Sequence, residues 1–507
     1  MSRISLKNRD ITSALAAAPS VARSCDAARR SCTLPHPGAM VDVRQGRQDS
    51  VAMTGKPTTG ENGAPLLNRR CLLGSALALP MLALPMAACS GNDDRKVLRW
   101  WSPQAAPAQA RAYRAQIAGF EAANPGYRVV FEPTSDEGYP AQFAAAFAAG
   151  QVPNIVTHLP SFAAQSYYAQ GLLEPMDGVA ATIGAARFLP GANAPYRAAD
   201  GRLSAVAIGG TAVDMLWLRR DLMAAAGIDT PPRDWDALRD ACRRMQTKRI
   251  YGAPLPYGSN SMTSLVFISF IHRAGGQVFT PDLQLALDSA PTYAALEFYR
   301  SMREYCPPSA SSYGWSDSLN AFVSGATATG IYGGRVLISA ARQNPRMART
   351  LVCVPYPSQT VATPSWTFND FPCLFIPKGA TEIAATKALA SSLYEPAGYV
   401  RQMLAAPGHV LPVLQGITDS PDYRGNPITS LFATQIATMT RAAAAGHNLG
   451  FESPAHRPNT KAGEIIASHA IAEMVQRVVI SGESAKAAVA RASSRIAAIM
   501  RGADVPR

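Results

Sequence analysis

The sequence predicts a globular α/β protein with at least two domains. Its 507 residues are too many for one ordinary hydrophobic core. Hydrophobic residues make up 48% of the chain and charged residues 16%, a composition typical of folded chains and not of disordered ones. Short strand-like and helix-like segments alternate with short connections, and this order favours α/β layers with largely parallel sheets.

The alternation begins after a short polar tether at 92–95. Three strand–helix pairs follow in a row, at 97–101 with 105–122, 127–131 with 141–149, and 154–157 with 161–170. Asp234 is a suitable N-cap for a later helix, and the C-terminal stretch at 488–500 repeats small and apolar residues every four positions. Two more helices are expected at 289–305 and 381–396.

The N-terminal region has the features of an export signal. Residues 71–88 carry no charge and directly follow Arg69 and Arg70. The stretch is short and interrupted by two prolines, whereas a membrane span needs about 20 apolar residues. The arginine pair resembles a twin-arginine signal and also fits a general export signal. Residues 1–88 are therefore set apart as a non-mature region, and the true start of translation could be Met40 or Met53.

The signal ends in small residues followed by Cys89, which resembles a lipoprotein processing site. Acylation of Cys89 would anchor the mature chain on the outer side of a membrane, in the periplasm or on the cell surface. The alternative is a plain secretory signal that is cleaved near Ala88, with Cys89 only adjacent.

The net charge of +13 does not predict a nucleic-acid partner. Residues 1–88 hold eleven Lys/Arg against five Asp/Glu, so the rest of the chain carries only +7. That remainder has no Lys/Arg run and no basic–aromatic stripe of the kind that nucleic-acid-binding proteins show.

No motif in the chain predicts a metal, a cofactor or catalysis. The mature body holds four further cysteines without a C-x-x-C spacing, so they form disulfides or stay as buried free thiols: Cys242, Cys306, Cys353 and Cys373. There is no Walker loop, H-E-x-x-H motif or G-x-S-x-G elbow. Two carboxylates that are distant in sequence can still form a glycosidase site, so a secreted carbohydrate-active hydrolase is the alternative function.

Seven segments occur in an order that resembles one known family. They are F-E-A-A-N-P-G-Y-R-V at 120–129, A-A-G-Q-V-P-N-I-V at 148–156, A-Q-G-L-L-E-P-M-D at 169–177, A-V-D-M-L-W-L-R-R-D-L at 212–222, A-G-I-D-T-P-P-R-D-W-D at 226–236, A-F-V-S-G-A-T-A-T-G at 321–330 and I-P-K-G-A at 376–380. This order, behind a lipoprotein-like signal, resembles the extracellular solute-binding proteins of family 1, the sugar-type receptors of ABC importers.

The resemblance implies a two-lobed periplasmic-binding-protein-like fold with an interlobe cleft and a hinge. The first lobe is expected at 95–208 and 373–412, and the second at 209–372 and 413–507. It further implies a monomer without cofactor that captures a carbohydrate, polyol or phosphorylated polyol and delivers it to the membrane permease of an ABC importer.

The chain departs from the family pattern at two places. The family usually has Asp where Asn154 stands, and many sugar binders have an aromatic residue where Arg335 stands, in Tyr332-Gly333-Gly334-Arg335. A guanidinium in the cleft favours a ligand with phosphate, carboxylate or vicinal hydroxyls, since it offers a planar fork of donors.

Sugar sites combine aromatic platforms with a few fixed polar groups. In the first lobe such residues follow the expected strands and turns, at Trp101, Tyr139, His158 and Ser161. Three of them have an ordinary structural alternative, Trp101 as a core tryptophan, Tyr139 as a turn tyrosine and His158 as a loop histidine. In the second lobe and the segment that returns from it, the candidates are Tyr257, Tyr313, Trp315, Tyr332, Arg335, Trp366, Asn369 and Asp370. Here the alternatives are turn residues and a surface salt bridge of Arg335.

Overall fold

The computed structural model describes residues 93–135 and 138–502. The chain divides into two units, Met1–Ala88 and Cys89–Arg507, and the description below concerns the second. The predicted export signal and Cys89 lie outside the described residues. Within the described ranges, no helix combines the length and the apolar character that a membrane crossing requires.

The first of two sheets has five strands in the order β2-β1-β3-β8-β4. Its strands are β1 (Lys96–Ser102), β2 (Tyr127–Pro133), β3 (Ile155–Leu159), β4 (Val206–Ala207) and β8 (Cys373–Phe375). β1 is parallel to both β2 and β3, as the three strand–helix pairs predict, whereas β8 is antiparallel to β3 and β4. The carboxyl ends of β1 and β3 and the amino end of β8 therefore meet at one edge of the sheet.

The second sheet corrects the expectation of largely parallel sheets. Its three strands, in the order β6-β5-β7, are β5 (Met215–Arg219), β6 (Thr329–Tyr332) and β7 (Leu351–Val354). β5 is antiparallel to both of its neighbours. More than a hundred residues separate β5 from β6, and the direction of such distant strands is set by tertiary pairing and not by local periodicity.

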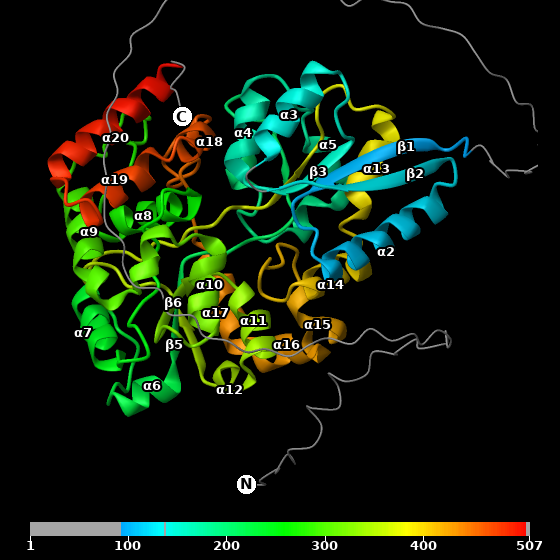
Figure 1. The fold of residues 1–507 in the computed structure, drawn as a ribbon. Helices are drawn as coiled ribbons and strands as arrows, with labels where there is room; N and C mark the ends of the chain where they lie inside the picture. Colours follow the sequence, from blue (N-terminus) through cyan, green and yellow to red (C-terminus); the bar gives the residue numbers. More distant parts are fainter. Residues whose placement is uncertain (1–92, 136–137, 503–507) are drawn as a thin grey trace, which may run out of the picture. The chain divides into compact units, whose positions relative to one another are not determined.

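Helices that are distant in sequence surround each sheet. On the side of the first sheet lie α2 (Pro107–Ala123), α3 (Tyr139–Ala148), α4 (Ser161–Ala169), α5 (Asp177–Ile183), α13 (Ile383–Ser392) and α14 (Pro396–Ala405). Figure 1 shows α14 beside blue α2, and the side chain of Gln116 in α2 donates a hydrogen bond to the Leu393 carbonyl, 277 residues away. The chain thus returns to the first sheet late in the sequence.

The second sheet and the segments around it carry the remaining helices. These are α6 (Arg220–Ala225), α7 (Trp235–Met245), α8 (Ser261–Arg273), α9 (Ala290–Ser301), α10 (Trp315–Val323), α11 (Arg335–Gln343), α12 (Pro345–Ala348), α15 (Pro421–Gly425), α16 (Pro427–Leu431), α17 (Ala433–Ala444), α18 (Ala462–Ala467), α19 (Ala470–Val479) and α20 (Ala485–Met500). Asp234 caps α7 through the Ala237 N–H as predicted. In Figure 1 the red helices α19 and α20 lie beside green α8 and α9.

Three segments carry the chain between the two sheets. Residues 208–214 lead from β4 to β5, residues 355–372 lead from β7 to β8, and residues 406–416 lead from α14, which packs on α2, towards α15 and α17. We call these three segments the crossings. The strands of the first sheet all lie within the residues predicted for the first lobe, and those of the second sheet within the residues predicted for the second lobe. The lobe boundaries themselves stay a prediction.

Asn154 explains one departure from the family pattern. It is buried, and its Oδ1 accepts the Arg99 N–H at 2.8 Å. Its Nδ2 donates to the Thr381 carbonyl at 2.7 Å and to the Thr386 hydroxyl at 2.8 Å. A carboxylate at this position could not donate to that carbonyl, so the amide suits these partners.

All four cysteines of the described residues are buried free thiols. The sequence left open whether these cysteines form disulfides or stay free, and in this structure they are free. Burial raises the pKa of the Cys306 thiol to about 11, so the thiol is protonated and unreactive at neutral pH.

A buried ion pair lies where the first crossing enters the second sheet. Asp214 and Arg273 are both 0% exposed, and Arg273 Nη2 donates to Asp214 Oδ2 at 2.7 Å. The other carboxylate oxygen accepts the Phe368 N–H of the second crossing at 2.8 Å. The pair therefore joins α8 to two of the crossings.

Removing one partner of this pair should be costly, since it leaves a buried charge without compensation. We expect Asp214→Ala to lower the free energy of unfolding by about 3–5 kcal/mol in urea denaturation. The double variant Asp214→Leu/Arg273→Met should recover most of this loss, because it removes both charges. A loss below about 1 kcal/mol for Asp214→Ala would contradict the assignment.

Candidate ligand-binding site

Polar side chains converge at the edge of the first sheet where β1 and β3 end. Ser102 is the last residue of β1, and His158 lies near the end of β3. The crossing that leads into β8 brings Asp370 and Phe371 to the same edge. In open α/β sheets ligands bind outside the carboxyl ends of the strands, so this edge is the candidate site.

His158 is held in an unusual backbone conformation at this edge. Its φ is 66°, and the pairing of β3 with β8 shifts register at this point. A non-glycine residue in the left-handed region is strained, and such strain concentrates at functional sites. The imidazole lies 3.4 Å from Ser102 Oγ and 3.1 Å from Gln402 Nε2 of α14. Burial lowers the pKa of His158 to about 3, so the ring is neutral at physiological pH.

Asn369 ties the crossings together. It is 2% exposed, and its Oδ1 accepts from the Thr211 N–H at 3.0 Å, from the Thr211 hydroxyl at 3.1 Å and from the Phe371 N–H at 2.8 Å. Its Nδ2 donates to the Ala443 carbonyl at 2.9 Å. These bonds agree with the alternative turn role for Asn369 and place it between the first and second crossings.

Ser161 and Asp370 are brought together beside Asn369. The Ser161 N–H donates to the Asp370 carbonyl at 3.0 Å, and the Asp370 N–H donates to the Thr211 hydroxyl at 2.9 Å. Asn448 Nδ2 donates both to Ser161 Oγ at 3.1 Å and to the Asn369 carbonyl at 3.0 Å. The start of α4 is therefore joined to the second crossing and to the segment after α17.

Arg335 lies at the start of α11 and is exposed. Its Nε donates to His409 Nε2 at 3.1 Å, and its Nη2 lies 3.5 Å from Gln104 Oε1, just beyond β1. Burial and the nearby Arg335 charge hold the pKa of His409 well below its usual value. Arg335 thus connects the second sheet's helices with the third crossing and the loop after β1.

Tyr332, three residues before Arg335, forms an aromatic contact with Trp315. Their ring centroids lie 5.7 Å apart in an edge-to-face arrangement, and Trp315 Nε1 donates to Ser261 Oγ at 3.3 Å. Trp217 Nε1 binds the Tyr332 carbonyl at 2.8 Å and fixes the end of β6.

Trp366 of the second crossing stacks on His272 of α8. The two rings are 4.4 Å apart and almost parallel, at 3°. Trp366 is 7% exposed, and the centroid of the His447 ring lies 6.2 Å from that of Trp366. Two residues that sequence reasoning did not name, His272 and His447, therefore accompany this candidate.

Four predicted site residues do not join the polar side chains at the sheet edge, namely Trp101, Tyr257, Tyr313 and Tyr139. Trp101 is 3% exposed, lies edge-on to Phe143 of α3 and has the Arg99 guanidinium over its ring, which agrees with the core alternative. Tyr257 is 0% exposed, and its hydroxyl donates to the Tyr299 carbonyl.

The other two residues of this set are half-buried. Tyr313 accepts a hydrogen bond from Ser309 in the loop before α10, and Tyr139 is the first residue of α3.

Sequence reasoning missed the residues that arrive from α14, the third crossing and the segment after α17. Gln402, His409 and Asn448 carry no motif, and only the return of the chain to the first sheet places them here. Five of the seven histidines, at 158, 272, 409, 447 and 456, lie on or beside these segments, a concentration that composition alone does not reveal. In the described part of the chain, no group of three or more His, Cys, Asp or Glu side chains is arranged to hold a metal.

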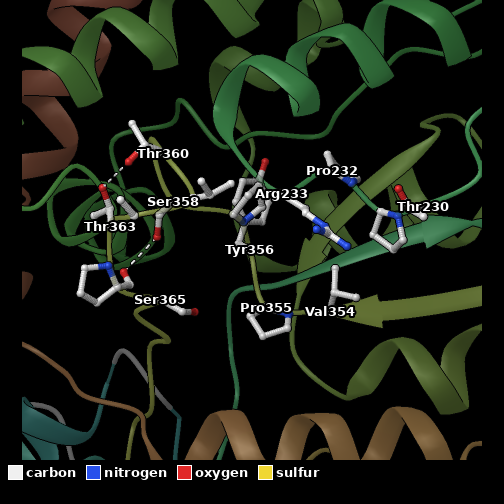
Figure 2. A pocket seen from close by; sticks show the side chains of 15 residues that line it. Thr230, Pro232, Arg233, Val354, Pro355, Tyr356, Ser358, Thr360, Thr363 and Ser365 are labelled. Atoms are coloured by element: carbon white, nitrogen blue, oxygen red, sulfur yellow. Dashed lines mark hydrogen bonds between the residues drawn. The ribbon is translucent and has the colours of Figure 1, made fainter.

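A surface hollow of about 620 Å³ lies elsewhere, between residues 230–233 and 354–365 (Figure 2). Prolines and small hydroxyl side chains dominate its lining, with Arg233 as its charged group, and no predicted site residue borders it. We keep the sheet edge as the candidate site because polar groups from several segments converge there.

Two sheets joined by three crossings, with polar groups at the edge of the first sheet, define the class of periplasmic-binding-protein folds. Solved structures agree with this class at the level of the fold. A solute-binding protein of Thermotoga lettingae bound with α-D-tagatose aligns with a TM-score of 0.67 at 20% identity, over 80% of this chain and 100% of its own. One of Agrobacterium vitis with bound D-mannitol aligns with a TM-score of 0.65 at 19% identity, over 81% of this chain and 100% of its own.

The chain belongs to the bacterial extracellular solute-binding proteins, whose family model matches residues 105–400. It is also 24% identical over 224 residues to YcjN of Escherichia coli (strain K12), regarded as an ABC transporter periplasmic-binding protein. That match covers 44% of this chain and about half, 51%, of YcjN. The predicted membership of the extracellular solute-binding proteins is confirmed.

Acid should reveal the buried neutral state of His158. Below pH 6.5 His158 is protonated in the unfolded chain, whereas in the folded chain its pKa is about 3 and it stays neutral. Protonation therefore favours the unfolded chain, and the free energy of unfolding decreases as the pH falls. Between pH 7 and pH 4 its contribution amounts to about 3 kcal/mol. We expect His158→Gln to show a smaller loss of unfolding free energy over this range in urea titrations. An unchanged pH slope would show that His158 is not buried in the neutral form.

Proposed function

We propose that this protein is the receptor of an ABC importer, and that it captures a sugar or polyol at the edge of the first sheet. The single observation that carries the proposal is the convergence of Ser102, His158, Ser161 and Arg335 at the place where the crossings meet. The tagatose and mannitol complexes of similar fold support the choice of ligand class.

The proposed mechanism is closure about the crossings. A ligand that contacts groups from both sheets favours the closed arrangement by its differential affinity, and membrane subunits then recognise that arrangement. Asn369 and Thr211 keep the crossings in register while the sheets move.

The N-terminal region completes the proposal. We infer that residues 1–88 are removed and that Cys89 carries the lipid that holds the protein on the outer side of a membrane. There the receptor acts as a monomer beside its permease. Mass spectrometry of the membrane-extracted protein tests the anchor, since an acylated N-terminal Cys89 peptide is expected and an unmodified one would contradict it.

Ligand-induced closure should be visible in solution. We expect the radius of gyration of the mature protein to decrease in small-angle X-ray scattering at saturating ligand, because the two sheets approach each other. Ligands come from a thermal-shift screen, where a ligand at 100 times its Kd adds about 2.7 kcal/mol of stability. An identical scattering profile with and without a bound ligand would rule out hinge closure.

Arg335 tests whether charge selects the ligand. Arg335→Ala should weaken a phosphorylated polyol about tenfold or more, because a charge-assisted bond is lost, and a neutral polyol much less. Arg342→Ala on the same helix serves as the matched control, measured in parallel by calorimetry. Equal losses for both ligands would remove the charge argument.

A further inference from the structure

Four exposed arginines gather where β5 ends and β7 begins. Arg220 directly follows β5, and Arg349 is the C-cap of α12, two residues before β7. The Arg220 N–H donates to the Thr350 carbonyl at 2.9 Å, so the two segments lie side by side. Arg342 lies in the last turn of α11 and Arg346 in α12. We call these four exposed arginines the arginine patch, and Figure 1 shows α6 and α12, which carry part of it, below β5.

The charge of the arginine patch is not compensated by the part of the chain that the structure describes. Within residues 93–135 and 138–502, the four guanidinium groups make neither an ion pair nor a hydrogen bond. The carboxylate beside them, Asp221, is already engaged, because its Oδ2 lies 2.7 Å from Arg219 Nη2 and its Oδ1 accepts the Thr350 hydroxyl at 3.0 Å. The patch therefore presents four positive charges to the solvent.

The segments around the patch are free of acidic residues. Residues 318–369 contain no Asp or Glu, and residues 423–451 contain none either. These two stretches include α11, α12, β7, α16 and α17, which pack against one another. The acid that precedes the second stretch, Asp422, borders a hollow together with Arg401 of α14. Folding thus collects arginines that form no run in the sequence on a face of one sign of charge.

An exposed leucine lies near the arginine patch. Leu431, the last residue of α16, is 47% exposed, and α16 packs on α11. Gln435, about one helical turn further on, donates through Nε2 to the Leu351 carbonyl at 2.8 Å, two residues after Arg349. An exposed apolar side chain among cations is typical of surfaces that lie on a membrane.

The chemistry of the patch favours a layer of phosphate groups as its partner. A guanidinium group suits phosphate, because its planar fork donates two parallel hydrogen bonds to the phosphate oxygens. An acidic peptide would need a groove to hold its backbone, and the patch lines neither the hollow of about 620 Å³ nor the one of about 490 Å³. Anionic phospholipids spread their phosphates over a surface that several arginines contact at once.

We propose that the arginine patch binds the headgroups of anionic phospholipids on the outer side of the membrane. The patch then holds the end of the second sheet against the lipid surface. This contact is separate from the proposed lipid on Cys89, so it restricts the orientation of the receptor beside its permease. The inference rests on the proposed function, because it requires that the receptor works next to a membrane.

The test measures co-sedimentation of the mature chain with vesicles, in a Cys89→Ser background that cannot be acylated. The vesicles contain phosphatidylcholine alone or mixed with phosphatidylglycerol. We expect this parent chain to bind only the mixed vesicles, and high salt to release it because salt screens exposed charges. The variant Arg342→Gln/Arg346→Gln/Arg349→Gln should bind about a hundredfold more weakly, since each arginine near an anionic surface contributes about fivefold. Its melting temperature should stay unchanged, because no bond within the described residues is lost.

The matched control is Arg111→Gln/Arg114→Gln/Lys387→Gln, which removes the same charge from exposed positions of α2 and α13 beside the first sheet. It should bind the mixed vesicles as tightly as the parent chain does. Equal losses for the two triple variants would overturn the inference, because binding would then follow the net charge and not the patch. An unchanged affinity of the patch variant would overturn it as well.

The remaining outcomes concern the class of partner. If the parent chain does not sediment with the mixed vesicles, the membrane is overturned as the partner of the patch. If it binds soluble polyglutamate instead, an acidic protein takes that place. The receptor function is decided separately, by solute binding and by scattering without vesicles, so a failure of this inference is distinguishable from a failure of the proposed function.

Discussion

The bonds that Asn369 makes between the crossings determine much of the arrangement at the proposed site. One carboxamide oxygen holds the backbone and hydroxyl of Thr211 and the Phe371 N–H, and the amide nitrogen reaches the segment after α17. A buried amide with this many partners is costly to break, since each lost bond leaves a polar group without water. The crossings are thereby fixed to one another while the two sheets remain separate hydrogen-bonded bodies. Asp214 adds a second tie, from the first crossing to the second and to α8.

Three histidines on these segments have a pKa below the usual value. Burial lowers the pKa values of His158 and His447, and burial together with Arg335 lowers that of His409. Neutral imidazoles offer one donor and one acceptor each, which suits hydroxyl groups better than anions. Arg335 is the exception at the site, and it is engaged with His409.

Local patterns predicted the elements that depend on local causes. The helix expected at 105–122 corresponds to α2, and Asp234 predicted the start of α7. The three parallel strands β1 to β3 followed from their short connections. The antiparallel second sheet did not, because β5 meets β6 and β7 only after long excursions of the chain.

The site was predicted only in part, because some of its residues arrive from distant segments of the chain. Residues that directly follow strands, such as His158 and Ser161, could be placed at the sheet edge from the sequence. Trp101 precedes the strand end and alternates to the other face, so its ring packs on α3. Gln402, His409 and His447 could not be found, because they reach the site on α14, in the third crossing and in the segment after α17, where no motif marks the return of the chain.

The most direct test of the account measures the distance between the two sheets. Donor and acceptor dyes are attached to cysteines introduced at Arg114 in α2 and at Lys248 after α7, since the four native thiols of residues 93–135 and 138–502 are buried. Energy transfer is then recorded on single molecules with and without a bound sugar or polyol. The account predicts a shorter distance in the ligand-bound protein. The same distance at saturating ligand would contradict it.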